Sequence, residues 1–286
     1  MAGMSNTDHV TVDWDAARDT NRANWDDRVP IQEGAYDVAA LDDPAHRSDV
    51  VRDDLPVLSR WLPSGSLDGL DVCHLQCHIG TDTVSLAREG ARVTGVDFSA
   101  PALASGAALA ERLGLDVTWV ETDVLDARAA VVGDFDVVYT SIGTICWLAD
   151  LDRWAAQVAA LLRPGGVFFI RDGHPALYAL DEGAPELVTR YRYFPDGTAQ
   201  QWEDAGTYAG EGTVANTRTY EWPHPLSEVV NALLGAGLRL RLLDEGRALP
   251  WRFSPRMVED GHGSWVWPAE DRDRLPTTFT VVATKD

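Results

Sequence analysis

Short apolar runs that alternate with helix-like segments are the feature that most constrains the fold of this chain. The runs are LDVCHL, ARVTGVDFS, DVTWVETDV, DFDVVYTSIG and VFFIRDG, all between residues 70 and 173. Apolar stretches such as DVVY and VFFI, bounded by turns, are typical of strands buried on both faces of a parallel sheet. The pattern predicts a doubly wound α/β domain, with helices over residues 81–90, 100–115 and 150–166.

Polar residues at the ends of the first three strands predict a ligand site. Ligands of such sheets bind beyond the carboxyl ends of the strands, and HLQCHIGTD lies at the first of these ends. The helix that follows offers free N–H groups to an anion. Asp97 ends the second strand about 20 residues after the loop, where an acid can accept hydrogen bonds from ribose hydroxyls. Asp123 ends the third strand and can accept from an adenine amine, so together these features predict a nucleoside site.

The cluster Cys73, His74, Cys77 and His78 could instead indicate a metal or haem site. Structural zinc needs a second pair of ligands, and the sequence offers one cluster only. Haem attachment needs export, for which the polar, acidic first residues provide no signal peptide. Cys146 brings the cysteines to three, an odd number that argues against a disulfide framework. We therefore interpret the cluster as a turn between strand and helix and expect no metal.

Charge and hydropathy exclude two classes of partner. The 286 residues contain 24 Lys plus Arg and 45 Asp plus Glu, for a formal net charge of -21. A surface this acidic repels nucleic acid unless it carries a segregated basic patch, and no basic run is present. No apolar run approaches the roughly 20 residues of a membrane helix. We expect a cytoplasmic protein, monomeric or homodimeric, that binds neither nucleic acid nor membrane and acts on a small molecule.

The ordered motifs from Leu70 to Pro175 resemble the class I S-adenosylmethionine-dependent methyltransferases. They are VCHLQCHIG at the cofactor loop, VTGVDFS at the ribose acid, VETDVLD at the adenine acid, and FDVVYTSIGTICWL followed by LLRPGGVFFI at the fourth and fifth strands. The resemblance implies a Rossmann-like seven-stranded sheet, mostly parallel, whose last strand is antiparallel; RLPTTFTVVATKD fits that strand. It also implies S-adenosylmethionine as cofactor and methylation of an oxygen or nitrogen atom.

The cofactor loop departs from the family's D-x-G-x-G-x-G pattern. His74 stands at the place of the acid, Gln76 and His78 replace two glycines, and Gly80 remains. Because both replacements carry a Cβ atom, we expect the loop to hold them at negative φ or to point them away from the cofactor. The resemblance implies cofactor contacts from His74, Gln76, Cys77, Gly80, Asp82, Asp97, Phe98, Asp123, Val124, Thr140 and Ser141.

Aromatic residues gather outside the predicted core. We divide the chain into an N-terminal helical lid segment (1–66), a cofactor-binding core (67–175), an inserted aromatic β-arm cap (176–225) and a C-terminal part that completes the sheet (226–286). A cap must exclude water and shape a pocket. We therefore expect acceptor contacts from Trp25, Tyr36, Trp147, Tyr178, Trp202, Tyr208 and Trp222. His174, or else His224, is the candidate base because a histidine pKa lies near working pH.

Two other functions stay open at this point. A nicotinamide-dependent oxidoreductase would share the strand order, but the three-glycine fingerprint is absent, and the only lysine, Lys285, leaves no Tyr-x-x-x-Lys pair. A non-catalytic nucleoside-binding protein is favoured by the altered loop alone. Binding of S-adenosylmethionine, of NADH or of neither separates the three.

Overall fold

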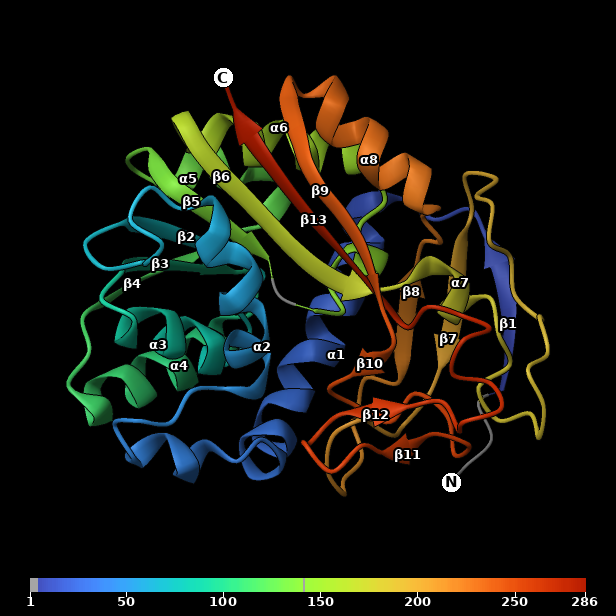
Figure 1. Ribbon diagram of the computed structural model, residues 1–286. Helices are drawn as coiled ribbons and strands as arrows, with labels where there is room; N and C mark the ends of the chain where they lie inside the picture. Colours follow the sequence, from blue (N-terminus) through green and yellow to red (C-terminus); the bar gives the residue numbers. More distant parts are fainter. Residues whose placement is uncertain (1–4, 141) are drawn as a thin grey trace.

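A seven-stranded sheet forms the centre of the computed structural model, which describes residues 5–140 and 142–286 (Figure 1). The strand order is β4-β3-β2-β5-β6-β13-β9. The first five strands in this order pair in parallel, whereas β13 runs antiparallel to both of its neighbours. The predicted mostly parallel sheet with an antiparallel last strand is confirmed. The strands are β2 (Asp71–Leu75), β3 (Arg92–Asp97), β4 (Val117–Glu121), β5 (Phe135–Thr140), β6 (Leu162–Gly173), β9 (Leu238–Gly246) and β13 (Thr278–Lys285).

Helices cover both faces of this sheet, because its strands are apolar on both sides. Along β5, Val138 packs into the core with Trp154, while its neighbours Val137 and Tyr139 face the opposite core. One layer contains α5 (Ala127–Ala130), α6 (Leu151–Leu161) and α8 (Leu226–Gly235), and the other contains α2 (Asp49–Leu58), α3 (Thr81–Arg88) and α4 (Ala100–Leu113) (Figure 1).

Helix α6 ends earlier than the sequence pattern predicts. The predicted segment reaches residue 166, but the helix stops at Leu161 and the chain continues directly into β6. Pro164 has no N–H to donate and disfavours helical geometry in the residue before it. Gly165 then adopts a φ of 81°. These two residues explain why the chain joins the sheet, where Leu162 pairs with Phe135.

A second, three-stranded sheet lies beside the core and is bridged to it by the long helix α1 (Trp14–Ala35) (Figure 1). Its order is β1-β7-β8, with β1 at Ser5–Val10, β7 at Ala199–Glu203 and β8 at Arg218–Glu221. Asn21 of α1 bonds both main-chain groups of Tyr220: its amide donates to the carbonyl and its oxygen accepts the N–H, each at 2.8 Å. Helix α1 thereby connects the core to the inserted strands.

A third, small sheet was not expected from the sequence. Strands β10 (Ala248–Leu249), β11 (Val258–Glu259) and β12 (Trp265–Val266) have two residues each, too few to show a period. These strands surround a small, separate hydrophobic cluster that includes Leu177. Leu177 belongs to the short helix α7 (Pro175–Tyr178). The 3-10 helices are η1 (Val38–Asp42), η2 (Ser59–Trp61), η3 (Val124–Asp126) and η4 (Ile145–Trp147).

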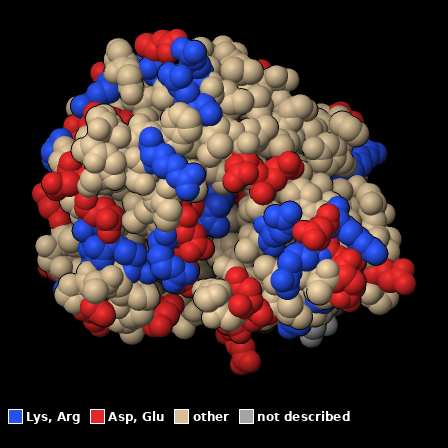
Figure 2. Space-filling model, viewed as in Figure 1, with Lys and Arg blue, Asp and Glu red and all other residues tan. Residues whose placement is uncertain are grey.

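The surface of the protein mixes both signs of charge. Figure 2 shows Lys and Arg side chains interspersed with Asp and Glu across one face of the molecule. Within residues 5–140 and 142–286, no helix is both long and apolar enough to cross a membrane. In the same part of the chain, no group of three or more His, Cys, Asp and Glu side chains is arranged to hold a metal ion.

Candidate functional site

The loop between β2 and α3 has a backbone conformation typical of glycine at two positions that are not glycine. Gln76 has a φ of 55° and His78 a φ of 50°, and both values lie in the left-handed region. Residues with a Cβ atom rarely adopt this region, which costs roughly 1–2 kcal/mol per residue. The first of the two expectations, that these residues take negative φ, is therefore wrong, and the second, that their side chains point away from the cofactor, stays a prediction. The loop keeps a conformation that suits glycine, although two of the glycines have been replaced.

Contacts of the two side chains hold the loop in this conformation. The Gln76 amide donates to the carbonyl of Thr144 at 3.0 Å, on the loop that follows β5. The His78 ring packs edge-on against Trp25, at 5.2 Å between centroids, and against Tyr36, at 6.2 Å. Burial lowers the pKa of His78 to about 3, so its ring is neutral. Each replacement connects the loop to a neighbouring segment.

Two other loop residues predicted to contact a cofactor have internal partners. His74 is fully buried, and its Nδ1 lies 2.9 Å from the Thr83 hydroxyl of α3. At Gly80, which has a φ of 77°, a Cβ atom would come within 2.5 Å of the Trp119 ring. The glycine is thus required by the packing of β4 against the start of α3. Cys77 is buried, and Asp82 lies in the first turn of α3.

Asp97 braces the loop from the end of β3. Its Oδ2 accepts the His78 N–H at 2.8 Å, and its Oδ1 accepts the Ser99 N–H at 2.9 Å. Each carboxylate oxygen can accept a second hydrogen bond. Burial raises the pKa of Asp97 to about 6, against the effect of these N–H groups. The side chain is therefore placed both to order the loop and to accept from a ligand hydroxyl, beside the half-buried Phe98.

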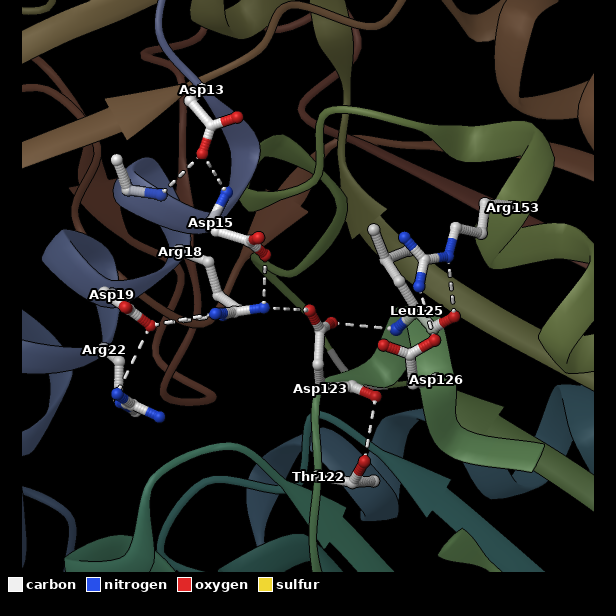
Figure 3. Close-up of polar contacts among 11 residues, drawn as sticks. Asp13, Asp15, Arg18, Asp19, Arg22, Thr122, Asp123, Leu125, Asp126 and Arg153 are labelled. Carbon is white, nitrogen blue, oxygen red and sulfur yellow. Dashed lines mark hydrogen bonds and ion pairs between the residues drawn. The ribbon is translucent and has the colours of Figure 1, made fainter. Parts of the chain in front are cut away.

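Asp123 lies at the end of β4 under the first turns of α1. Its Oδ1 accepts the N–H of Leu125 at 2.9 Å. Its Oδ2 is buried and has no hydrogen-bond partner among the residues that the structure describes. Figure 3 shows Arg18 reaching this carboxylate from α1, at 3.7 Å, while it also binds Asp15 at 2.8 Å and Asp19 at 3.1 Å. An accepting oxygen thus remains open at the edge where the sequence predicts an adenine.

Arg28 is a buried cation near the same loop, and no sequence motif marks it as a site residue. Its side chain lies on α1, is 8% exposed, and donates from Nε to Asn24 at 2.6 Å. The guanidinium also lies over the Trp25 ring, 5.1 Å from the centroid. Within residues 5–140 and 142–286, no carboxylate lies within 4 Å of it, although a buried charge is normally paired. This arrangement is suited to an anionic ligand group.

Aromatic side chains close the space around Arg28. Trp147 packs against Trp25 at 5.3 Å between ring centroids. The hydroxyls of Tyr36 and Tyr208 are hydrogen-bonded at 2.5 Å. Four of the aromatic residues predicted to contact an acceptor therefore lie together above the loop.

Asp172 organises the loop that follows β5. It is 1% exposed and accepts the N–H groups of Gly143 at 2.6 Å, Thr144 at 2.9 Å and Ile145 at 3.1 Å. It also accepts the Thr144 hydroxyl at 3.0 Å and its neighbour's N–H, that of Gly173, at 2.6 Å. Thr140, at the end of β5, is fully buried with an unpartnered hydroxyl oxygen among the described residues. Ser141, also a predicted cofactor contact, lies outside the described residues.

An inner pocket of about 30 Å³ opens beyond the ends of β5 and β6. It shares Trp222, Pro223 and His224 with an outer hollow of about 340 Å³. The inner pocket contains two of the predicted acceptor contacts, Tyr178 and Trp222. A third, Trp202 of β7, packs against Tyr191 at 5.3 Å between centroids. The full lining of the inner pocket is Ile145, Cys146, Gly173, Pro175, Tyr178, Arg192, Tyr193, Gln200, Glu221, Trp222, Pro223 and His224.

Both candidate histidine bases already contact protein groups through their ring nitrogens. His174 caps α7 by accepting the Ala176 N–H at Nδ1, and its Nε2 lies 2.9 Å from Glu245. His224 lies 2.6 Å from the Leu148 carbonyl through Nε2 and 3.3 Å from Glu228 through Nδ1. Proton transfer from an acceptor to either ring would require one of these contacts to open.

Comparisons with known proteins agree with this geometry. Residues 73–168 match a family model described as a methyltransferase domain. The chain is 30% identical over 131 residues to a ubiquinone biosynthesis O-methyltransferase of Caulobacter vibrioides, covering 46% of this chain and 52% of that protein. It is 35% identical over 136 residues to a cypemycin N-terminal methyltransferase of a Streptomyces species, covering 46% and 54%. The chain thus spans about half the length of the curated relatives it matches.

A solved structure shares the fold over most of the chain. It is described as a putative S-adenosylmethionine dependent methyltransferase from Listeria monocytogenes. Its TM-score is 0.56 at 19% identity, and the match covers 82% of this chain and 99% of that one. The matched model and the sheet order lead to one conclusion: residues 73–168 form a methyltransferase domain, in a chain that shares the fold of S-adenosylmethionine-dependent methyltransferases.

Proposed function

We propose that this protein transfers a methyl group from S-adenosylmethionine to a small-molecule acceptor. The observation that carries the proposal is the set of open polar groups at the ends of the parallel strands. Among the described residues they are Asp123 Oδ2, which has no hydrogen-bond partner although Arg18 lies 3.7 Å away, the spare acceptor capacity of Asp97, and the Arg28 guanidinium, which has no carboxylate within 4 Å. An amine, two hydroxyls and a carboxylate of one molecule would satisfy them. The residues present therefore fit the cofactor.

Each end of the cofactor has a candidate partner. Asp123 would accept from the adenine amine beside the buried Val124, and Asp97 would accept from the ribose hydroxyls. Arg28 would hold the carboxylate of the methionine end, for which the altered loop offers no side-chain cation because His78 is neutral. When bound, S-adenosylmethionine supplies a methyl group that is already activated on a sulfonium. The chain then has to position the acceptor and exclude water, which can contribute about 7–11 kcal/mol.

We propose that α1 is the lid over this cofactor. Its Arg18 lies 3.7 Å from Asp123, its Trp25 packs against His78, and its Arg28 lies over the Trp25 ring. The helix extends past Pro30 to Ala35 and bonds β8 through Asn21, so deleting it would also release the inserted strands. Point substitutions therefore test the lid more cleanly than truncation. We also propose that the chain divides into an N-terminal lid segment (1–66), a cofactor-binding core (67–175), a cap (176–225) and a C-terminal part that completes the sheet (226–286).

Relatives that act on different atoms leave both an oxygen and a nitrogen acceptor open. One matched relative is named an O-methyltransferase and another an N-terminal methyltransferase. The mixed charge of the visible face and the aromatic walls of the two cavities support a small molecule over a nucleic acid (Figure 2).

Binding of labelled S-adenosylmethionine, followed by equilibrium dialysis, tests the cofactor assignment. Replacing Asp123→Ala should weaken binding by about 10-fold or more, because a hydrogen bond to a charged group contributes roughly 1.5–3 kcal/mol. Asp126→Ala, an exposed neighbour on the same turn, is the matched control and should leave the affinity unchanged. Equal affinity in all three proteins, or absence of binding to the wild type, would contradict the proposal.

A further inference from the structure

Two polar side chains project side by side from the inserted sheet into the inner pocket. Gln200 of β7 and Glu221 of β8 are directly paired in the antiparallel register, so their side chains lie on the same face of the sheet. Both line the inner pocket. The Glu221 carboxylate accepts hydrogen bonds, and the Trp202 side chain already acts on it as a donor. The Gln200 amide can donate, so the pocket offers an acceptor and a donor side by side.

Glu221 lacks a cation. Within residues 5–140 and 142–286, no Arg, Lys or His nitrogen lies within 4 Å of its carboxylate. A second carboxylate, Glu182, is also without an ion pair in that part of the chain and acts on Glu221 by charge repulsion. The positive charge of Arg28 lowers the pKa of Glu221, but the proposed function assigns Arg28 to the carboxylate of the cofactor. The other titratable groups around Glu221 are Cys146 and Tyr178, whose pKa values burial raises well above their usual range, and Arg192 and His224 of the pocket wall.

Gln200 provides the second, independent observation. The side chain is 6% exposed, and its amide nitrogen is buried with no hydrogen-bond partner among the described residues. A buried donor that makes no hydrogen bond lowers the stability of the protein, so such groups normally have a partner. An oxygen atom of a ligand in the pocket would provide it.

The size of the inner pocket restricts what can enter it. The inner pocket has a volume of about 30 Å³, whereas one ordered water needs roughly 10–15 Å³ on the same measure, so the pocket admits one small polar head group. The remainder of an acceptor would lie in the adjoining outer hollow, which Trp14 and Trp222 line.

We propose that the acceptor is a primary or secondary amine with an oxygen atom close to its nitrogen. This inference rests on the proposed function and specifies its substrate class. Glu221 accepts the N–H of the amine and Gln200 donates to the oxygen. Amino amides, amino alcohols and amino sugars have this pattern. A hydroxyl acceptor would satisfy Gln200 but would leave the negative charge around Glu221 without compensation.

The reaction balances without a further reagent. The lone pair of the amine nitrogen forms the new N–C bond, the C–S bond breaks, and its electron pair stays on sulfur as a thioether. The positively charged nitrogen then loses one proton to the Glu221 carboxylate, which releases it to water. Burial raises the pKa of Glu221 to about 7, a value near working pH that suits a group exchanging a proton in each turnover.

Methyl transfer from labelled S-adenosylmethionine into two matched sets of compounds tests the inference. The first set contains amino-acid amides, 2-aminoethanols and glucosamine; the second contains the corresponding 2-hydroxy amides, ethanediols and glucose. Products are identified by mass spectrometry, and cofactor binding is measured on the same preparations. We expect N-methylated products from the first set only.

Variants connect the activity to the two side chains. Glu221→Gln should lower transfer at neutral pH by roughly 10²–10⁴-fold, with cofactor affinity within threefold of the wild type. Glu221→Asp should recover part of the rate, and Gln200→Leu should raise KM for acceptors that carry the oxygen more than for simple amines. Glu259→Gln, exposed on β11, is the control for charge and should have full activity.

Each outcome supports or overturns one statement. A wild type that binds no S-adenosylmethionine overturns the proposed function. A wild type that binds it but methylates only the hydroxyl set, or neither set, overturns the amine inference alone. So does a folded Glu221→Gln protein that keeps more than a third of the wild-type rate.

Discussion

Replacing Asp172 should be among the most destabilising single changes in this chain. Its carboxylate accepts four main-chain N–H groups and one hydroxyl, all within 3.1 Å, at a position that is 1% exposed. In Asp172→Ala these donors lose their acceptor together. A buried donor without a partner costs about 1–3 kcal/mol.

The total should be smaller than the sum of five such costs. Gly143 is half-buried, so water can replace the carboxylate there, and the loop can relax. We expect Asp172→Ala to lower the free energy of unfolding by about 3–5 kcal/mol, a large part of the 5–15 kcal/mol typical of a folded protein. Asp172→Asn keeps one accepting oxygen but turns an NH₂ group toward the donors, and should cost about 2–3 kcal/mol.

Urea denaturation followed by tryptophan fluorescence measures these differences. Asp150→Asn is the matched control: Asp150 is exposed, caps α6 through one N–H at 2.8 Å, and is replaced by an equally good cap. Its stability should stay within about 0.5 kcal/mol of the wild type. A loss below about 1 kcal/mol in Asp172→Ala would refute the reasoning, because it would mean that the donors find other partners without cost.

Four further predictions follow from other contacts. At His78, the Gly variant should be more stable than the Ala variant by about 1–2 kcal/mol in urea denaturation, since only Ala keeps the left-handed strain; equal stability would contradict a φ of 50°. Arg28→Gln should weaken S-adenosylmethionine binding in a titration by about 10-fold or more but leave adenosine binding unchanged, because adenosine lacks the carboxylate; Arg22→Gln, exposed on the same helix, is the control, and an equal loss for both ligands would disprove the assignment. Asp54→Ala should cost about 3–5 kcal/mol in the same denaturation assay by leaving the buried Arg171 unpaired, and Tyr139→Phe, which removes only the 2.5 Å hydrogen bond to Asp54, should cost about 1 kcal/mol; similar losses would argue against a buried ion pair. The folded chain holds the Glu221 proton between pH 4.5 and about 7, where the unfolded chain has lost it, so wild-type stability falls as pH rises through this window; Glu221→Gln should therefore gain more relative to the wild type at pH 7.5 than at pH 5, and a pH-independent difference would show that the carboxyl is not perturbed.

The sequence predicted the core sheet because its evidence is local. Apolar runs such as VFFI, Ser99 before α4 and Gly114 after it determine strands and helix ends from neighbouring residues. Asp97, which ends β3, and Asp123, two residues beyond the end of β4, follow from the same pattern. The small sheet of β10 to β12 could not be predicted, because its two-residue strands are stabilised by distant contacts of Leu249 and Trp267.

The site was harder to predict where function depends on pairs of residues far apart in the chain. His174 and His224 were predicted as bases because a free histidine has a pKa near working pH. In the structure, their rings contact Glu245 and Glu228, respectively. Glu221 has no motif around it, and its pairing with Gln200 appears only in the strand register. Arg28 resembles any charged residue of an amphipathic helix, and only its burial without a carboxylate distinguishes it.

The order of strands in the central sheet also constrains how the chain can be synthesised. Strand β13 lies between β6 and β9, although β9 is made first. A nascent chain that stops before Thr278 therefore leaves β6 with an open edge and β9 with no strand to pair with. Helix α1 likewise leaves the ribosome long before Tyr220, its partner in β8. Exposed strand edges favour association with other chains, so the growing chain is most prone to aggregation before β13 has been made.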